Sequence, residues 1–357
     1  MKEKYKKLAY AMRRANEGEP LTVAFLGGSI TEGIVASSTE KCYAYLVYQW
    51  WCETFPDSHI SYVNAGIGGT TSHFGVGRVE EDILSQKPDV VFIDFTVNDV
   101  AEEFFRETFE GLLRRILYSD TEPAVMILNN VQYDTGINAQ EYHNSIADYY
   151  KVPYVSVKDT IYRRMLEGEF DMSYITPDAL HPNDIGHRMV ADELIKELKM
   201  ANCHLESEPQ SEDKLPPMTE NAYEYSKRID NRISSPSLHG FRKDMNPKER
   251  YLDVFKRGWM ANKAGDRFTI ELEASCIAVQ YRKTIRRPAP VARLVLDGDM
   301  EKPIILDSNF DEDWGDCLYL KPVLHHGKKD THRIDIEIIK ATEDDNEEFY
   351  LMSFIVS

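Results

Sequence analysis

Four short segments carry residue types that together can perform acyl transfer. Ser29 lies in LTVAFLGGSITEG, directly after an apolar run, and Gly69 lies in YVNAGIGGTTS, after the next one. Asn98 follows the apolar run DVVFIDF, and Asp178 and His181 stand close together in TPDALHPNDIGH. A serine hydroxyl, a histidine and a carboxylate are the groups of a nucleophile, its base and the residue that orients the base. This set of residues points to chemistry on an ester carbonyl.

Each segment also has an ordinary structural explanation when it is taken alone. Gly-Gly-Ser after a strand is a common loop, and a serine such as Ser29 is a common helix N-cap. The glycines around Gly69 let the backbone approach a ligand closely, or they form a flexible turn. The side chain of Asn98 can donate a hydrogen bond to a developing oxyanion. An Asn-Asp turn, with Asp99 capping the next helix, is an equally good local interpretation.

The spacing of Asp178 and His181 suits a triad. The carboxylate can reach the Nδ1 side of the imidazole, which leaves Nε2 free for a serine hydroxyl. Pro182 and Asn183 then lead into a predicted helix. His187 falls within that helix, and we expect a structural or surface role for it.

The elements that must position these residues follow from the hydrophobic pattern. LTVAFL, HISYV, DVVFIDF, AVMIL and VPYVSV read as strands, and residues 41–55, 101–117 and 138–150 suit helices. The strands are apolar throughout, as in a parallel sheet that helices cover on both faces. The fold class predicted here is therefore α/β with three layers, and the candidate residues follow the strands, where open α/β sheets bind ligands.

The pattern changes after residue 204. Residues 205–220, LESEPQSEDKLPPMTE, are rich in charge and proline and read as a linker. Residues 221–357 contain strand-length segments such as FTIELEA, CIAVQYR and HRIDIEII with no helical pattern between them. We therefore expect a catalytic domain over residues 1–204 and an all-β sandwich, or jelly roll, over residues 221–357.

The joint occurrence of these segments, in this order, resembles the SGNH, or GDSL-like, hydrolase superfamily. The resemblance implies a flavodoxin-like sheet with the strand order 2-1-3-4-5. It also implies that Ser29 is the nucleophile and an oxyanion-hole donor, with Gly69 and Asn98 as the other two donors. His181 would be the general base and Asp178 the residue that orients it. This chemistry requires no metal and no cofactor.

The resemblance covers roughly residues 21–200 and departs from the common pattern at two positions. Gly28 stands where the Gly-Asp-Ser form has aspartate, and Thr96 stands where a glycine usually precedes the asparagine segment. Neither departure removes a reacting group. Both leave the subfamily open.

The two-domain arrangement is similar to that of bacterial carbohydrate acetyl esterases, in particular the mannan acetyl esterase type of carbohydrate esterase family 17 with its CBM35-like module. This implies an oligosaccharide ester as substrate and removal of its O-acetyl groups. Tyr133, Trp259 and Trp314 are the aromatic residues that we expect to contact sugar rings. An acyl thioesterase or lysophospholipase of the same superfamily, and a non-catalytic carbohydrate-binding protein, remain alternatives.

Composition narrows the partners further. The chain has 357 residues and a formal net charge of −18, which disfavours nucleic acid and anionic membranes because phosphates would be repelled. No apolar run is long enough for a membrane span, and the N-terminal residues lack the apolar stretch of a secretory signal. The five cysteines match neither a zinc nor a disulfide pattern, so we expect a cytoplasmic protein. The acidic residues within 307–316 are interpreted as a solvated turn, with calcium binding as the alternative. Homo-oligomer formation stays open.

Overall fold

The computed structural model describes residues 3–202, 213–249 and 253–357. The chain divides into two compact units, Met1–Glu224 and Tyr225–Ser357. Each unit is described by itself below.

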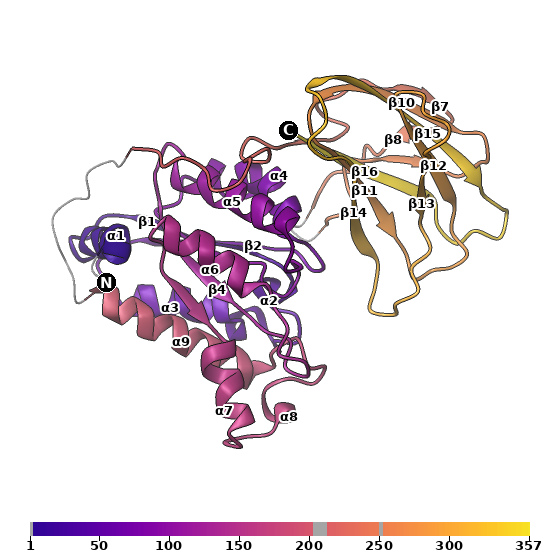
Figure 1. The fold of residues 1–357 in the computed structure, drawn as a ribbon. Coiled ribbons are helices and arrows are strands. Elements are labelled where there is room, and N and C mark those ends of the chain that lie inside the picture. The colour runs from indigo at the N-terminus through magenta and orange to yellow at the C-terminus, as the bar shows by residue number, and fades with distance from the viewer. Residues whose placement is uncertain (1–2, 203–212, 250–252) are drawn as a thin grey trace. The chain divides into compact units, whose positions relative to one another are not determined.

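The first unit is built around a parallel sheet of five strands in the order β2-β1-β3-β4-β5 (Figure 1). The strands are β1 (Leu21–Gly27), β2 (Ile60–Gly66), β3 (Val90–Asp94), β4 (Ala124–Asn129) and β5 (Tyr154–Ser156). β1, β3 and β4 are almost wholly buried, which explains their continuous apolar sequences. Their carboxyl ends lie at one edge of the sheet because all the strands run in the same direction.

Helices cover both faces of this sheet, as Figure 1 shows. The helices are α1 (Lys6–Asn16), α2 (Ser29–Glu32), α3 (Tyr43–Thr54), α4 (Ser72–Asp82), α5 (Glu103–Leu117), α6 (Gln140–Tyr149), α7 (Arg163–Leu166), α8 (Met172–Ile175) and α9 (Asp184–Asn202). Side chains of α1, α3 and α9 form one apolar cluster with alternate residues of the strands, such as Phe25, Phe92 and Met126. α4, α5 and α6 pack side by side as the other layer.

The second unit is a sandwich of two antiparallel sheets. One sheet has the order β13-β12-β15-β10-β7, and the other has the order β14-β11-β16-β9-β8, with β6 pairing with β16. The strands are β6 (Lys227–Ile229), β7 (Ser237–His239), β8 (Arg242–Lys243), β9 (Trp259–Ala261), β10 (Arg267–Ala274), β11 (Ile277–Lys283), β12 (Val291–Leu296), β13 (Ile304–Asp307), β14 (Cys317–Leu324), β15 (Asp330–Lys340) and β16 (Phe349–Val356). Inward-facing side chains of both sheets form one apolar core.

The predicted fold class is confirmed. The expected strands of the first unit match β1 to β5 within a few residues at each end, and the expected helices match α3, α5 and α6. The sequence pattern did not identify the strands β6, β7, β8, β9, β13 and β14, or the helices α4, α7 and α8. Most of these elements are too short to show a hydrophobic period. The longer α4 contains two glycines, and β14 contains a proline, and both residue types are typical of loops.

The predicted linker falls partly outside the described residues, as does Cys203. Its described part, residues 213–220, is held against α5: the carboxylate of Glu110 accepts hydrogen bonds from the amides of Met218 and Thr219, at 2.6 and 2.8 Å. The described cysteines Cys42, Cys52, Cys276 and Cys317 are all free thiols. Within the described ranges, no helix has both the length and the apolar character needed to cross a bilayer.

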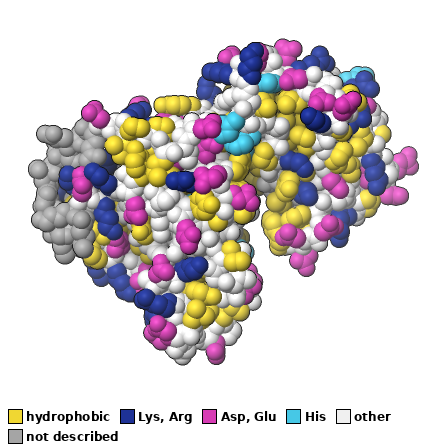
Figure 2. All heavy atoms as spheres, in the orientation of Figure 1, with side chains coloured by type: hydrophobic (Ala, Val, Ile, Leu, Met, Phe, Trp, Pro, Cys, Tyr) yellow, Lys and Arg dark blue, Asp and Glu magenta, His cyan; other side chains and the backbone are white. Residues whose placement is uncertain are grey.

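Acidic and basic side chains are interspersed on the face drawn in Figure 2. The excess of carboxylates is spread over that face rather than gathered in one patch. The charge pattern alone therefore marks no binding surface there.

Candidate active site

Ser29, His181 and Asp178 form a hydrogen-bonded chain, although Ser29 and His181 are far apart in the sequence. The hydroxyl of Ser29 lies 2.8 Å from Nε2 of His181. Nδ1 of the same ring lies 2.7 Å from Oδ2 of Asp178. A carboxylate at Nδ1 selects the tautomer with its proton on Nδ1, so Nε2 is the acceptor that faces the serine hydroxyl. This is the arrangement that a serine nucleophile needs.

Asp178 is held as a carboxylate by its own loop. Its Oδ1 accepts hydrogen bonds from the amides of Leu180, at 3.0 Å, and His181, at 2.7 Å. Partial burial opposes ionisation, but the hydrogen bonds from the ring and amide of His181 and from the Leu180 amide lower the pKa of Asp178 below its usual range. The group therefore stays ionised at the pH values where an imidazole base works.

The loop that carries Asp178 and His181 is fixed at several points. The amide of Tyr133 donates to the carbonyl of Ala179 at 2.7 Å, which joins the loop to the segment after β4. Asn183 caps α9, because its Oδ1 accepts from the amides of Ile185 and Gly186. A loop anchored in this way keeps its histidine in place at low entropic cost when substrate binds.

Asn98 lies beside the turn that carries Ser29. Its Oδ1 is only 2.4 Å from the position that a Cβ on Gly28 would occupy. An aspartate at position 28, as in the Gly-Asp-Ser pattern, would therefore force Asn98 to move. Thr96, the other departure, is buried, and its hydroxyl donates to the carbonyl of Leu128 at 3.1 Å. The two departures thus take part in the packing around the site.

Gly69 follows β2 and has a φ of +66°, a conformation that favours glycine. Gly68, its neighbour, packs against the nucleophile, since a Cβ on Gly68 would lie 3.6 Å from the Cβ of Ser29. The structure thus brings the segments of Ser29, Gly69 and Asn98 together at the carboxyl edge of the sheet, as expected from their positions after strands.

A buried polar cluster is formed by Thr31, Asp94 and Asn130, and Thr31 lies two positions after Ser29. The sequence did not predict this cluster. The Oδ2 of Asp94 accepts from Asn130 at 2.9 Å and from the Thr31 hydroxyl at 3.1 Å. Burial raises the pKa of Asp94 to about 7, while the hydrogen bonds from Asn130 and Thr31 oppose that rise. An aspartate inside the otherwise apolar run DVVFIDF was the available signal in the sequence.

Asp99 does not cap the following helix, so that interpretation is wrong. α5 begins after Glu102, and Asp99 points instead toward α4 and α6. Its Oδ1 accepts from the amide of Ser72 at 2.9 Å, and its Oδ2 lies 3.0 Å from Nε2 of His143. The Asp99–His143 pair is fully buried and ties the start of α4 to the segment of Asn98.

The three aromatic residues predicted to contact sugar differ in how exposed their side chains are. Tyr133 is 2% exposed and Trp259 is fully buried in the sandwich core, so the prediction that their rings stack on sugars is wrong. Both rings are large apolar surfaces that folding removes from water. Trp314 is 54% exposed and packs edge-on against Phe310, so its sugar contact stays a prediction.

His187 has the structural position expected of it. It is fully buried, its ring stacks on Tyr43, and its Nδ1 accepts from the Tyr43 amide at 3.3 Å. Burial lowers the pKa of His187 to about 4. It therefore remains a neutral packing residue beside the site.

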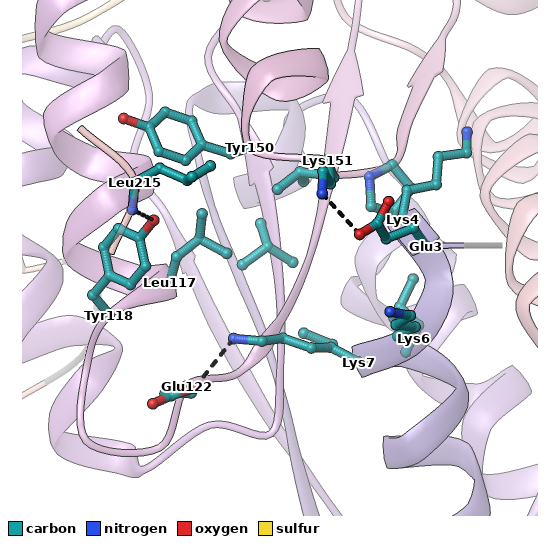
Figure 3. Close-up of a pocket in the computed structure, with 15 residues that line it drawn as sticks. Glu3, Lys4, Lys6, Lys7, Leu117, Tyr118, Glu122, Tyr150, Lys151 and Leu215 are labelled. Carbon is teal, nitrogen blue, oxygen red and sulfur yellow. Dashed lines mark hydrogen bonds and ion pairs between the residues drawn. The ribbon is translucent and has the colours of Figure 1, made fainter. Parts of the chain in front are cut away.

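A separate pocket lies at the opposite edge of the sheet (Figure 3). It is lined by the start of β4 and the residues before β5, together with Tyr118 and Tyr150. Its lysines face carboxylates: Lys151 lies 2.7 Å from Glu3, and Lys7 lies 3.7 Å from Glu122. None of the predicted site residues lines this pocket, so it is not where we place the chemistry.

Comparison with known proteins agrees with the geometry. Residues 25–189 match the model of the GDSL-like lipase/acylhydrolase family. The whole chain is similar to the crystal structure of a two-domain esterase (CEX) active on acetylated mannans, with 46% sequence identity and a TM-score of 0.96. That likeness covers 99% of this chain and 95% of the other. The chain belongs to the GDSL-like lipase/acylhydrolase family, and it is a carboxylic ester hydrolase.

Two curated relatives are more distant. An acetylxylan esterase from Geobacillus stearothermophilus is 26% identical over 165 residues, which are 40% of this chain and 74% of the relative. Thioesterase 1/protease 1/lysophospholipase L1 from Escherichia coli is 26% identical over 187 residues, which are 50% of this chain and 83% of the relative. Both matches cover only part of this chain, whereas the match to the two-domain esterase also includes the sandwich.

Proposed function

We propose that this protein is a serine esterase that removes O-acetyl groups from acetylated carbohydrates through an acyl-enzyme on Ser29. The observation that carries the proposal is the chain of contacts from the Ser29 hydroxyl through His181 to Asp178, at 2.8 and 2.7 Å. A serine alcohol is a weak nucleophile unless a base removes its proton. The position of His181 beside the hydroxyl of Ser29 is therefore what makes Ser29 a candidate nucleophile.

The first half of the reaction transfers the acyl group to the enzyme. Ser29 Oγ attacks the carbonyl carbon of the acetyl ester, and its proton passes to Nε2 of His181. The negative charge that forms on the carbonyl oxygen is stabilised by hydrogen bonds that the amides of Ser29 and Gly69 and the side chain of Asn98 donate. The tetrahedral intermediate collapses, the ester C–O bond breaks, and the sugar oxygen leaves with the proton from His181.

The second half returns the enzyme to its starting state. A water molecule gives a proton to Nε2 of His181 and attacks the acetyl carbonyl carbon, and the same donors hold the second oxyanion. Collapse breaks the bond to Ser29 Oγ, which recovers its proton from His181, and acetate leaves. Asp178 stabilises the imidazolium in both halves through its contact with Nδ1.

The proposed substrate class is acetylated oligosaccharides, with acetylated manno-oligosaccharides first. It is supported by the 46% identity over both units to an esterase active on acetylated mannans, a structure of which was also obtained after co-crystallisation with mannopentaose. We propose that the chemistry belongs to a catalytic domain within residues 1–204. Residues 221–357, after the linker at 205–220, would then act as a CBM35-like carbohydrate-binding module.

The test compares the wild-type protein with Ser29→Ala on 4-nitrophenyl acetate, butyrate and octanoate. We expect a preference for acetate, and a fall in kcat/KM of at least about 10⁴-fold in Ser29→Ala. Mass spectrometry on acetylated manno- and xylo-oligosaccharides should show stepwise loss of acetyl groups. Full activity in Ser29→Ala would overturn the nucleophile assignment.

A thioesterase or lysophospholipase function is the second candidate, because the relative from Escherichia coli carries that name. A preference for octanoate over acetate, or release of thiol from an acyl thioester faster than release of acetate from sugars, would favour it.

A further inference from the structure

Glu32 lies three positions after Ser29, at the end of the same short helix α2 (Ser29–Glu32). Its side chain points back to the segment after β2. The Oε2 of Glu32 accepts a hydrogen bond from the amide of Gly68 at 2.7 Å. Gly68 directly precedes Gly69, one of the proposed oxyanion-hole donors. The nucleophile's helix thus holds the backbone that presents that donor.

The contact is close enough to determine where Gly68 lies. A Cβ on Gly68 would be 3.2 Å from Oε2 of Glu32 and 3.6 Å from the Cβ of Ser29. The side of Gly68 on which a Cβ would stand therefore faces both the carboxylate and the nucleophile.

Two further hydrogen bonds hold the same turn, but neither is at Gly68 itself. The amide of Ile67 donates to the carbonyl of Gly27 at 3.1 Å, and the hydroxyl of Thr70 donates to the carbonyl of Ile67 at 2.7 Å. Glycines adopt many backbone conformations, so Gly68 and Gly69 need an external contact to stay in one of them. Glu32 supplies that contact.

Glu32 is half-buried, and partial removal of a carboxylate from water is costly, which argues that its position has a use. Burial raises the pKa of Glu32, and the Gly68 amide together with the charges of His181 and Arg78 opposes that rise. Removing a carboxylate from water disfavours folding unless hydrogen bonds or charges compensate. Perturbed acids of this kind gather at functional sites.

We propose that Glu32 is a positioning residue that holds the Gly68–Gly69 turn, so that the Gly69 amide faces the oxyanion formed during ester hydrolysis. This inference rests on the proposed function. It assigns Glu32 no contact with substrate and no proton transfer. Its effect is expected mainly in the transition state, because the oxyanion exists only there and in the adjacent intermediates.

The experiment compares Glu32→Ala, Glu32→Asp and Glu32→Gln on 4-nitrophenyl acetate. Alanine lacks the acceptor, and aspartate is one methylene too short to reach Gly68, so both should lower kcat by about 10- to 100-fold with KM within about threefold. Glutamine keeps an acceptor oxygen at the right distance, so it should retain kcat within about threefold. Glu40→Ala, at an exposed site, is the matched control and should behave as wild type.

A second readout separates positioning from a general structural effect. A boronic acid inhibitor forms a tetrahedral adduct on a reactive serine, so its affinity reports on the oxyanion donors. Glu32→Ala should weaken this inhibition by the same factor as it lowers kcat/KM, while thermal unfolding shows each variant folded. If Glu32→Ala does not fold, Glu32→Asp, which keeps the charge, provides the same comparison.

Three outcomes would overturn the proposal: an unchanged kcat in Glu32→Ala and Glu32→Asp, a fall in kcat with no loss of boronate affinity, or a Glu32→Gln variant as impaired as Glu32→Ala. Ser29→Ala distinguishes these outcomes from failure of the proposed function. If Ser29→Ala is inactive while Glu32→Ala is normal, only the role of Glu32 is lost. If Ser29→Ala is active, the proposed function itself fails.

Discussion

The carboxyl edge of the parallel sheet and the interior of the sandwich both bury polar side chains, and each buried polar group requires a partner with good geometry. At the edge, Asp94 and Asp99 are buried close to Asn98 in the sequence, and the buried ring of His143 contacts Asp99. In the sandwich, Asp244 accepts from the Tyr350 hydroxyl at 2.5 Å, and other buried polar side chains pair in the same way. The two units differ instead in how deeply their histidine–aspartate pairs are buried.

Two histidine–aspartate pairs make this comparison measurable. The pair of His143 and Asp99 in the α/β unit is fully buried, at 3.0 Å. The pair of His332 and Asp297 in the sandwich, at 2.7 Å, has an aspartate side chain that is 47% exposed. The shorter contact is also the more solvent-exposed one. The distance alone therefore does not predict how much a pair contributes to the free energy of unfolding.

The largest effect on stability is expected from His143→Ala. It leaves Oδ2 of the buried Asp99 without its histidine partner and removes a ring that stacks on Phe109 at 3.7 Å. We expect a loss of about 3–5 kcal/mol in the free energy of unfolding, measured by urea denaturation. His332→Ala, the matched control, should cost less than about 1 kcal/mol. Equal losses in the two variants would remove the distinction between the regions.

The next effect concerns pH. Burial raises the pKa of Asp94 to about 7 in the folded protein, above the value of about 4 for an unfolded aspartate. The folded state therefore binds this proton more tightly than the unfolded state. The free energy of unfolding decreases as pH rises from about 4 to about 7. Above that range the cost levels off at up to about 4 kcal/mol.

Asp94→Asn tests this linkage because it removes the ionisation and keeps the size of the side chain. The free energy of unfolding of the variant, relative to wild type, should be higher at pH 8 than at pH 5. Any constant loss from altered hydrogen bonds cancels in that difference. The same relative stability at both pH values would mean that Asp94 does not titrate in this range.

Gly28→Ala should affect activity more than stability. The added Cβ would come within 2.4 Å of Asn98 Oδ1 and displace that side chain. We expect kcat to fall by about 100-fold, the loss typical of one oxyanion donor. In a double-mutant cycle, Gly28→Ala should add little to Asn98→Ala, because both remove the same interaction. Additive losses would show that Gly28 acts through another group.

The smallest effect is expected in the sandwich. Trp314 offers an exposed ring, and stacking on a sugar is worth about 1 kcal/mol. Trp314→Ala should therefore raise KM for an acetylated manno-oligosaccharide by about fivefold and leave hydrolysis of 4-nitrophenyl acetate unchanged. An unchanged KM on the oligosaccharide would show that Trp314 takes no part in binding it.

Residue type and spacing predicted more of the site than of its surroundings. Ser29, Asp178 and His181 were singled out from the sequence because their functional groups have few substitutes in acyl transfer. Glu32 and His143 were not, because a glutamate at the end of a short helix and a histidine in an amphipathic helix look like surface residues. Tyr133 and Trp259 were misjudged for the opposite reason: exposure of an aromatic ring cannot be read from its identity.

The sequence by itself determined the α/β and β-sandwich classes, because hydrophobic periodicity is a local property that can be recognised in one sequence. It also determined which side chains are capable of the chemistry. Only the tertiary structure decided that Ser29 and His181 meet at 2.8 Å and that Glu32 reaches Gly68 at 2.7 Å. It also decided that Asn98 fills the space beside Gly28. These contacts join segments that are distant in sequence, and they depend on the register and packing of the parallel strands, which no local pattern encodes.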